Sequence, residues 1–337
     1  MSDSSRRAIS PDDLPPVEPP TAGFLVQLFL VPAIIVGIIV AVWIAFHWLA
    51  QLGNDPEGYL KALRRPTEGR WQAALNLAND LRGPGGAAFK QDATLATQLA
   101  GILADEVASG RPRAAGYGGE QSRALCDYLC RALGEFAVPE AAAPLVARAA
   151  DVADPRIARS AVEALAVLSA TLSAADRGLP DVAAARAALL EASKSDDAGL
   201  RSAASFALGV VGGEAAADRL LALEGDAVED VRFNAATGLA RLGRPEAYGT
   251  LEEMLALPDV AVAAGDEAAQ AGRYRRALIV VNALKAVGLL VDAARESPPG
   301  AVAAAVAALA DDPVADVRAA ATALAGKFDR VTAAGSP

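Results

Sequence analysis

The sequence predicts an all-α protein: a right-handed α-solenoid of about seven helical hairpins, preceded by one transmembrane helix and a disordered N-terminal tail. Three observations support this fold class. The chain of 337 residues is rich in alanine and only 5% aromatic, which favours helices over sheets. One long apolar run without a charged residue lies near the N-terminus. The remaining chain repeats one helical pattern at intervals of about 30 to 45 residues, the period of helical-pair solenoids.

Residues 1–23 form the predicted disordered tail. They are dominated by serine, aspartate and proline and carry almost no large apolar side chains, so burial cannot offset the entropy lost on ordering. The prolines favour a polyproline-II stretch, and residues 16–19 match the PxxP pattern of peptide ligands. A stiff, solvated spacer is the simpler interpretation, and the role of this tail stays open.

Residues 24–51 form the predicted transmembrane helix, whose expected partner is the lipid bilayer. The stretch from Leu28 to Ala50 has no formal charge and is long enough to cross a hydrocarbon layer of ~30 Å. Its C-terminal end gathers the residues typical of a membrane interface, Trp43, Phe46, His47 and Trp48. A cleaved signal peptide is the alternative, but the preceding segment is long and acidic and no A-x-A site follows.

The flanking charges predict the orientation of this helix. Lysine and arginine are absent from the positions that directly precede Leu28, whereas four basic residues follow the apolar run: Lys61, Arg64, Arg65 and Arg70. Basic residues near a span favour the cytoplasmic side. The C-terminal solenoid is therefore expected in the cytoplasm.

Residues 52–330 form the predicted solenoid, and residues 331–337 a disordered C-terminal tail. Each repeat unit starts with an acidic residue, continues with an apolar residue and an arginine, and then places apolar residues at helical spacing. The clearest units are 196–213, 226–243 and 311–328, and weaker ones are 70–81, 122–136, 154–169 and 273–288. Each unit is the second helix of a hairpin, because one hairpin alone cannot bury its apolar stripe and stacked neighbours can.

The repeated charges indicate a structural ladder. The acidic residues are expected to cap the second helices, and the arginines to lie near acidic groups of neighbouring repeats. The predicted ladder residues are Asp196, Arg201, Asp226, Arg232, Asp312 and Arg318, with Arg159 and Arg276 extending the arginine series.

Composition excludes most catalytic and cofactor chemistry. The only histidine, His47, lies in the apolar run, so a histidine-based triad, zinc centre or di-iron centre cannot form in the aqueous part. Cys126 and Cys130 lie four residues apart on one helix face, which favours core packing over a disulfide or zinc site. No catalytic, cofactor-binding or metal-binding residue is therefore predicted. The net charge of −10 argues against nucleic acid as a partner.

The segment from Asp226 through Val231, Arg232, Ala235 and Leu239 resembles a HEAT repeat, and the unit at Asp312 has the same pattern. Pro-Glu-Ala openings at 139–141 and 245–247 strengthen the resemblance. With its single span, the chain is similar to uncharacterised bacterial single-pass membrane HEAT-repeat proteins. This resemblance implies a non-catalytic scaffold or adaptor in the bacterial inner (cytoplasmic) membrane that binds a protein partner whose identity the sequence does not give.

An enzyme with HEAT-like repeats is the alternative. Relatives of deoxyhypusine hydroxylase need histidine and glutamate pairs for iron, and HEAT-like DNA glycosylases need a basic groove; this sequence has neither. A tetrapyrrole lyase of the phycobilin type needs no histidine, and a copurifying pigment would favour it. The glycine-rich loops 83–86 and 116–119 lack the lysine of a phosphate loop. The insertion 258–272 is expected to be a spacer or a place of partner contact.

Overall fold

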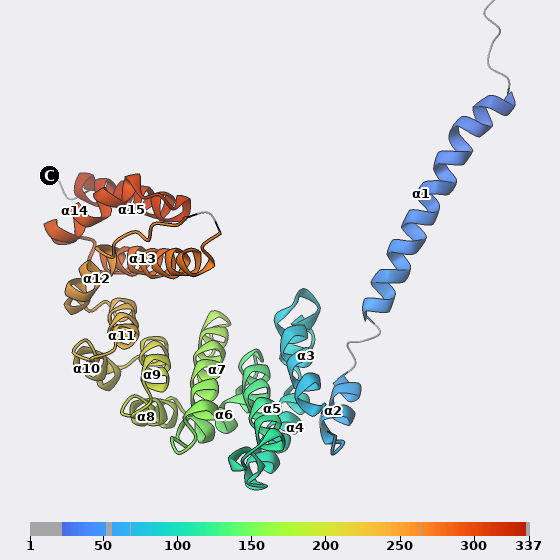
Figure 1. Cartoon of the computed structure of the whole chain (residues 1–337), viewed down its shortest axis with the longest axis horizontal. Helices are drawn as coiled ribbons and strands as arrows, with labels where there is room; N and C mark the ends of the chain where they lie inside the picture. Colours follow the sequence, from blue (N-terminus) through green and yellow to red (C-terminus); the bar gives the residue numbers. More distant parts are fainter. Residues whose placement is uncertain (1–21, 52–55, 68, 264, 335–337) are drawn as a thin grey trace, which may run out of the picture. The chain divides into compact units, whose positions relative to one another are not determined.

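The computed structural model describes residues 22–51, 56–67, 69–263 and 265–334 (Figure 1). They are arranged in two units, residues 1–55 and residues 56–337. The described residues of both units form helices and their short connections and contain no strand. The all-α prediction is thereby confirmed.

The first unit contains one helix, α1 (Ala22–Gln51), with Pro32 inside it. Its stretch from Val26 to Phe46 is long and apolar enough to cross a membrane and is a candidate span. Apolar side chains along this stretch are exposed, as expected of a helix that is surrounded by lipid. Because α1 begins at Ala22, the last two residues of the predicted 1–23 tail are helical, while 1–21 lie outside the described residues.

The described residues of the second unit form a stack of seven helical hairpins, which confirms the predicted solenoid. Each of the seven sequence units falls on the second helix of a hairpin. The hairpins are α2 (Pro56–Arg64) and α3 (Arg70–Arg82), α4 (Ala93–Ala108) and α5 (Tyr117–Gly134), α6 (Ala142–Ala149) and α7 (Pro155–Ala174), α8 (Val182–Ala192) and α9 (Ala198–Val211), α10 (Glu214–Leu223) and α11 (Glu229–Arg241), α12 (Tyr248–Leu255) and α13 (Glu267–Ala294), and α14 (Gly300–Ala308) and α15 (Ala315–Ala334).

Short 3-10 turns occupy several connections. The two Pro-Glu-Ala openings form such turns directly before α6 and α12, because proline fits the first helical position, where no backbone donor is needed. The turns are η2 (Pro84–Ala87), η3 (Phe89–Gln91), η4 (Arg111–Arg113), η5 (Pro139–Ala141), η6 (Pro245–Ala247) and η7 (Leu309–Asp311).

The hairpins of this unit stack in two layers. Each second helix packs mainly against the second helices of the adjacent hairpins, and the first helices form the other layer. Within the unit, the second helices α9, α11 and α13 lie on the inner side of its curve, and α8, α10 and α12 on the outer side (Figure 1). The inner layer therefore offers a concave surface.

One continuous apolar core runs from Leu60 to Leu324 between these layers. Leucine and alanine fill most of it, and small residues allow close contact between second helices. At Gly209 on α9, a Cβ atom would lie 2.4 Å from the Cα of Gly238 on α11. The same occurs at Gly134 on α5, where a Cβ atom would lie 2.8 Å from the Cα of Ala164 on α7.

Two further helices resemble spans by composition alone. Both α7 and α13 are long and apolar enough to cross a membrane, yet at least half of their most apolar stretch is buried inside the solenoid. The buried part of each helix belongs to the protein core.

The predicted tail 331–337 is wrong for its first four residues. Helix α15 continues to Ala334, because Val331 packs against the core and Thr332 is hydrogen-bonded to Ser297 at 2.9 Å. These contacts offset the conformational entropy that residues 331–334 lose when they become helical. Residues 335–337 lie outside the described residues.

Candidate functional site

Arg201, near the start of α9, joins the fourth hairpin to the fifth. Its guanidinium donates two hydrogen bonds to Asp226, from Nε to Oδ2 at 2.8 Å and from Nη2 to Oδ1 at 3.0 Å. Its Nη1 donates to the carbonyl oxygens of Ser195 and Asp196 in its own hairpin, at 2.9 and 3.0 Å. The hydrogen bonds from Arg201 lower the pKa of Asp226, against the opposing effect of burial.

Arg232 and Arg276 repeat this arrangement in the next two hairpins. Arg232 on α11 donates to the carbonyl of Asp226 at 3.1 Å and to Glu253 on α12 at 2.6 Å. Arg276 on α13 donates to the carbonyl of Leu257 at 3.0 Å, and its Nη1 lies 2.6 Å from Oδ2 of Asp312. Each arginine thus binds a carbonyl of its own hairpin and a carboxylate of the following one.

Arg318, on the last described hairpin, makes only the first of these contacts: its Nη1 donates to the carbonyl of Asp312 at 2.6 Å. Asp196 takes part through its backbone carbonyl rather than its carboxylate. The structure therefore brings Arg201 and Asp226 together directly, and Asp312 together with Arg276.

Sequence reasoning missed ladder members in the first hairpins. Arg70 on α3 donates to the carbonyl of Leu63 at 2.6 Å and to Glu106 at 2.6 Å. Glu106 is buried and also accepts hydrogen bonds from Arg111 and Ser122. Burial opposes its ionisation, but these hydrogen bonds outweigh it and lower the pKa of Glu106. Glu106 lies inside α4 rather than in the turn, so the regular spacing gives no sign of it.

Arg159 does not belong to the ladder, contrary to the predicted arginine series. It lies on the surface of α7 and pairs with Glu163 of the same helix at 3.5 Å. The residue that links α7 to another hairpin is Arg156, whose Nε donates to Asp127 on α5 at 2.9 Å. Arg156 and Arg159 are nearly one turn apart, and tertiary contacts decide which of them faces the neighbouring repeat.

The predicted capping by Asp196, Asp226 and Asp312 is wrong in detail. Asp197, not Asp196, caps α9, because its Oδ1 accepts from the backbone N–H of Leu200 at 2.7 Å. Asp226 and Asp312 accept from the N–H two residues later, at 2.9 and 2.8 Å, ahead of their helices. These are Asx turns, in which the carboxylate fixes the connection before the helix starts.

Cys126 and Cys130 are free and buried in the core on α5, as predicted. Burial raises the pKa of the Cys126 thiol to about 12 and raises that of Cys130 as well. Both thiols are therefore protonated at neutral pH and unsuited to nucleophilic or metal chemistry.

The inner surface contains a hollow of about 490 Å³, formed by three consecutive second helices. Small residues of α9 (Gly199, Ser202 and Ala203) leave the space open. The hollow is defined by Arg159 and Glu163 on α7, Ala198, Gly199, Ser202, Ala203 and Phe206 on α9, Val228 just before α11, and Asp230 and Asn234 on α11.

Hydrogen bonds hold the polar groups of this hollow in place. Asn234 donates from Nδ2 to Oγ of Ser202 at 2.8 Å, and Ser202 donates to the carbonyl of Asp230 at 3.2 Å. Arg241 lies over the ring of Phe206, with 5.2 Å between the guanidinium carbon and the ring centroid. The hollow thus offers the fixed amide of Asn234 and hydroxyl of Ser202, together with the carboxylate of Asp230 and the exposed pair of Arg159 and Glu163, and these groups suit hydrogen bonding to a polypeptide.

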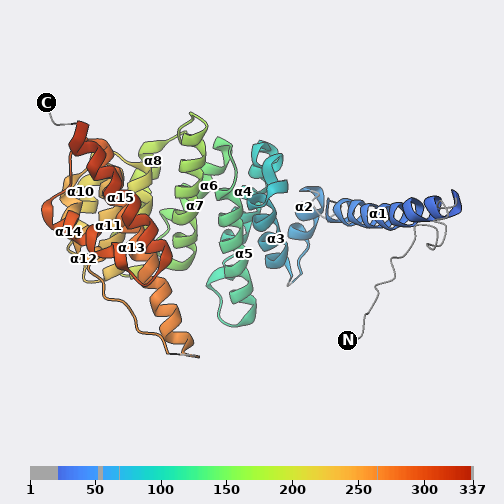
Figure 2. The same ribbon diagram turned by 90° about the horizontal axis from the view of Figure 1, so that it is seen from above.

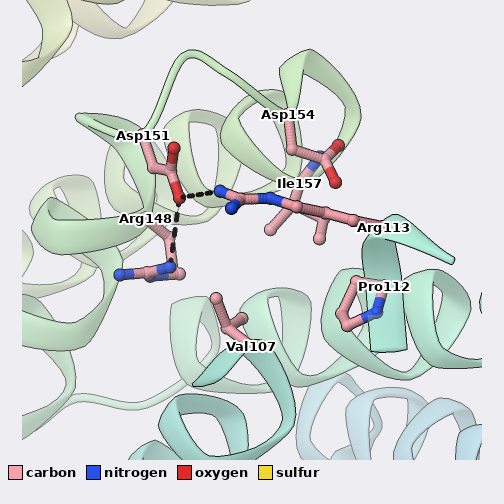
Figure 3. Close-up of a pocket in the computed structure, with 7 residues that line it drawn as sticks. All are labelled: Val107, Pro112, Arg113, Arg148, Asp151, Asp154 and Ile157. Carbon is pink, nitrogen blue, oxygen red and sulfur yellow. Dashed lines mark hydrogen bonds and ion pairs between the residues drawn. The ribbon is translucent and has the colours of Figure 1, made fainter. Parts of the chain in front are cut away.

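A second cavity lies between the second and third hairpins (Figure 3). Arg113 and Arg148 both point at Asp151, each 3.4 Å from its Oδ2. The cavity holds only about 10 Å³, little more than room for one water molecule. It is a gap in the packing and not a ligand site.

Comparisons with known proteins give one family match, to HEAT repeats over residues 186–271. Among solved structures, human deoxyhypusine hydroxylase in complex with glycerol is 21% identical, over 82% of this chain and 96% of that one, with a TM-score of 0.31. A designed armadillo repeat protein is 16% identical, over 81% and 99% of the two chains, with a TM-score of 0.34. A search of curated proteins finds no match.

Seven stacked helical hairpins with a charged ladder define an α-solenoid repeat protein. The family match covers α9 and α11, the two helices that carry the best-formed rung of the ladder. Residues 186–271 of this solenoid match the HEAT-repeat family model.

Proposed function

We propose that this chain is a membrane-anchored scaffold that binds a segment of a partner protein in the hollow and carries out no catalysis. The hollow itself is the observation that supports this most: fixed polar groups converge there from α7, α9 and α11. Solenoids commonly use such concave surfaces for recognition. Attachment through α1 would raise the local concentration of the scaffold at the membrane.

A non-catalytic role is supported by the residues available for chemistry. The sequence places no histidine after residue 47. Within the described ranges, no group of three or more histidine, cysteine, aspartate or glutamate side chains could hold a metal ion. Both cysteines are buried and protonated. The iron chemistry of a deoxyhypusine hydroxylase and cysteine-based catalysis both lack their required groups here.

Site-specific photocrosslinking in native membranes tests the proposal. A benzoylphenylalanine at Arg159, which lies at the edge of the hollow and pairs only within its own helix, should capture one or a few defined proteins. The same amino acid at Leu221, an exposed position on α10 in the outer layer, is the matched control. Filling the hollow with Asn234→Arg should abolish the crosslinks made from position 159.

The result that would overturn the proposal is equally definite. Identical products from positions 159 and 221, or no product from position 159, would count against recognition in the hollow. A pigment or small molecule that copurifies with the chain and is lost in the Asn234→Arg variant would favour the alternative of an enzyme.

A further inference from the structure

A second concave feature lies on the sixth hairpin, where the repeat carries its insertion. The connection between α12 and α13 is long, and the first turns of α13 extend past the ends of the neighbouring helices (Figure 2). Between these turns, the connection and the start of α15 lies a groove of about 450 Å³. We call it the α13 groove, defined by Val262, Tyr274, Leu278, Val281, Val314 and Asp316.

The α13 groove is mainly apolar, unlike the hollow. Tyr274 and Leu278 are 67% and 47% exposed, which are high values for large side chains. The two residues lie on successive turns of α13. Val281 continues the same stripe by one further turn and packs partly against the core. A contiguous exposed apolar surface of this kind marks an interaction site more often than a random surface position does.

The arginines near the α13 groove are already neutralised. Arg273 lines the groove itself, and it donates to Asp259 and to the carbonyl of Val260, both at 2.9 Å. Arg275 pairs with Asp230 on α11 at 2.7 Å. Because Asp230 lines the hollow, this ion pair connects the helix of the groove to the hollow. Arg276 is buried with Asp312.

The carboxylates around the α13 groove have no such cationic partners among the described contacts. Asp316 lines the groove directly. Three more exposed acidic residues lie on the flanking segments: Asp266, Glu267 and Asp311. The exposed cations on α13 and α15 are Arg275, Lys285, Arg318 and Arg330. Arg275 is paired with Asp230, so the unpaired carboxylates beside the groove leave negative charge at its rim.

From this apolar floor and acidic rim, we infer that the α13 groove binds a basic amphipathic segment of a partner protein. Apolar side chains of the partner would cover Tyr274, Leu278 and Val281, and a lysine or arginine would pair with Asp316. The stripe from Tyr274 to Val281 is about 10 Å long at 1.5 Å per residue, enough for about two helical turns of the partner. The inference rests on the proposed function, because it assigns a chemical class to the partner of the same concave surface.

Binding of two designed peptides to the full chain tests the inference. The chain is placed in nanodiscs of zwitterionic lipid, so that anionic lipid does not compete. The probes are fluorescent amphipathic peptides of about 14 residues with the same leucine spacing. One has lysine and the other glutamate at the polar positions, and fluorescence anisotropy gives the dissociation constants.

We expect saturable binding of the leucine–lysine peptide and much weaker binding of the leucine–glutamate peptide. Leu278→Ser should weaken the first by about tenfold, since one buried leucine is worth roughly that factor. Asp316→Lys should weaken the leucine–lysine peptide by about threefold and strengthen the leucine–glutamate peptide. Leu221→Ser on the outer layer is the matched control and should leave both affinities unchanged.

Several outcomes would overturn the inference. One is that the leucine–lysine peptide shows no saturable binding. Another is that Leu278→Ser and Leu221→Ser weaken its affinity equally. A third is that Asp316→Lys changes the affinity of neither peptide. Self-association of the chain that Leu278→Ser abolishes would assign the groove to a second copy instead. Leu278 is 47% exposed and Asp316 is exposed as well, so circular dichroism should show that both variants fold like the parent chain. Failure here with crosslinking retained at position 159 would refute this inference and leave the proposed function standing.

Discussion

At the scale of single residues, cohesion between repeats depends on arginines that contact two hairpins at once. Arg201 donates to two carbonyl groups of the connection between α8 and α9 and to a carboxylate of the next hairpin. Both side chains of its pair with Asp226 are largely buried, at 17% and 11% exposure. Hydrogen bonds to charged groups contribute about 1.5–3 kcal/mol each when they are shielded from water. The surface pair of Glu191 and Lys194 is more than half exposed and should contribute far less.

Replacement of Asp226 tests this role. Asp226→Asn removes the charge that accepts from Arg201, and we expect the free energy of unfolding to fall by about 1.5–3 kcal/mol at pH 7. The pKa of Asp226 is lowered in the folded chain, so its stabilising effect is present above the ordinary aspartate value of about 3.9 and is lost as the pH falls through the lowered value. The difference between parent and variant should therefore shrink below about pH 4. Urea unfolding of the full chain in micelles, followed by circular dichroism, measures it.

The control for this experiment is Glu191→Gln, which should change the unfolding free energy by less than about 0.5 kcal/mol. An Asp226→Asn effect as small as that of the control would contradict a cohesive role for the ladder. So would an effect that stays constant down to pH 3, since the charge would then not be its source.

At the scale of helices, the stacking of second helices depends on glycines at crossing points. Gly209 on α9 lies so close to Gly238 on α11 that a Cβ atom at position 209 would be 2.4 Å from the Cα of Gly238 and has no space. Glycine costs a helix about 1 kcal/mol relative to alanine, so its presence in mid-helix is favourable only where packing requires it. Gly101 on α4 differs, because a Cβ atom there would meet nothing within 4 Å.

Gly209 and Gly101 make a matched pair of predictions. We expect Gly209→Ala to destabilise the solenoid by about 1–3 kcal/mol, because α9 and α11 must move apart. Gly101→Ala should stabilise it by about 0.5–1 kcal/mol, through helix propensity alone. Urea unfolding midpoints of the two variants check both values. Equal shifts of the same sign would show that the close approach at Gly209 does not constrain the packing.

At the scale of the whole molecule, two units with different surroundings share one chain. The apolar side chains of α1 are exposed throughout its candidate span, whereas α7 and α13, which are also long and apolar enough to span a membrane, bury at least half of their most apolar stretch in the solenoid. Composition alone does not separate these cases. What separates them is whether neighbouring repeats supply an apolar surface for the helix to pack against.

The basic residues after α1 predict that the solenoid lies in the cytoplasm. A fluorescent reporter fused after Pro337 should be active in cells, and an alkaline phosphatase fusion at the same point should be inactive. Changing Lys61, Arg64 and Arg65 together to glutamate removes most of the charge bias and should produce a mixed or inverted topology. Phosphatase activity of the unaltered chain would overturn the predicted orientation.

The sequence by itself determined the all-helical class, the seven hairpins, the location of the apolar helix and the core position of both cysteines. These features follow from local patterns, because apolar spacing and the repeated arginines recur on every second helix. Only the tertiary structure decided that Arg156 rather than Arg159 links neighbouring repeats, that Glu106 and Glu253 complete the ladder, and that α15 extends to Ala334. It alone revealed the hollow and the α13 groove. The physical reason is that side chains one turn apart are equivalent in sequence pattern, and the rotation and spacing of packed helices select the one that makes contact.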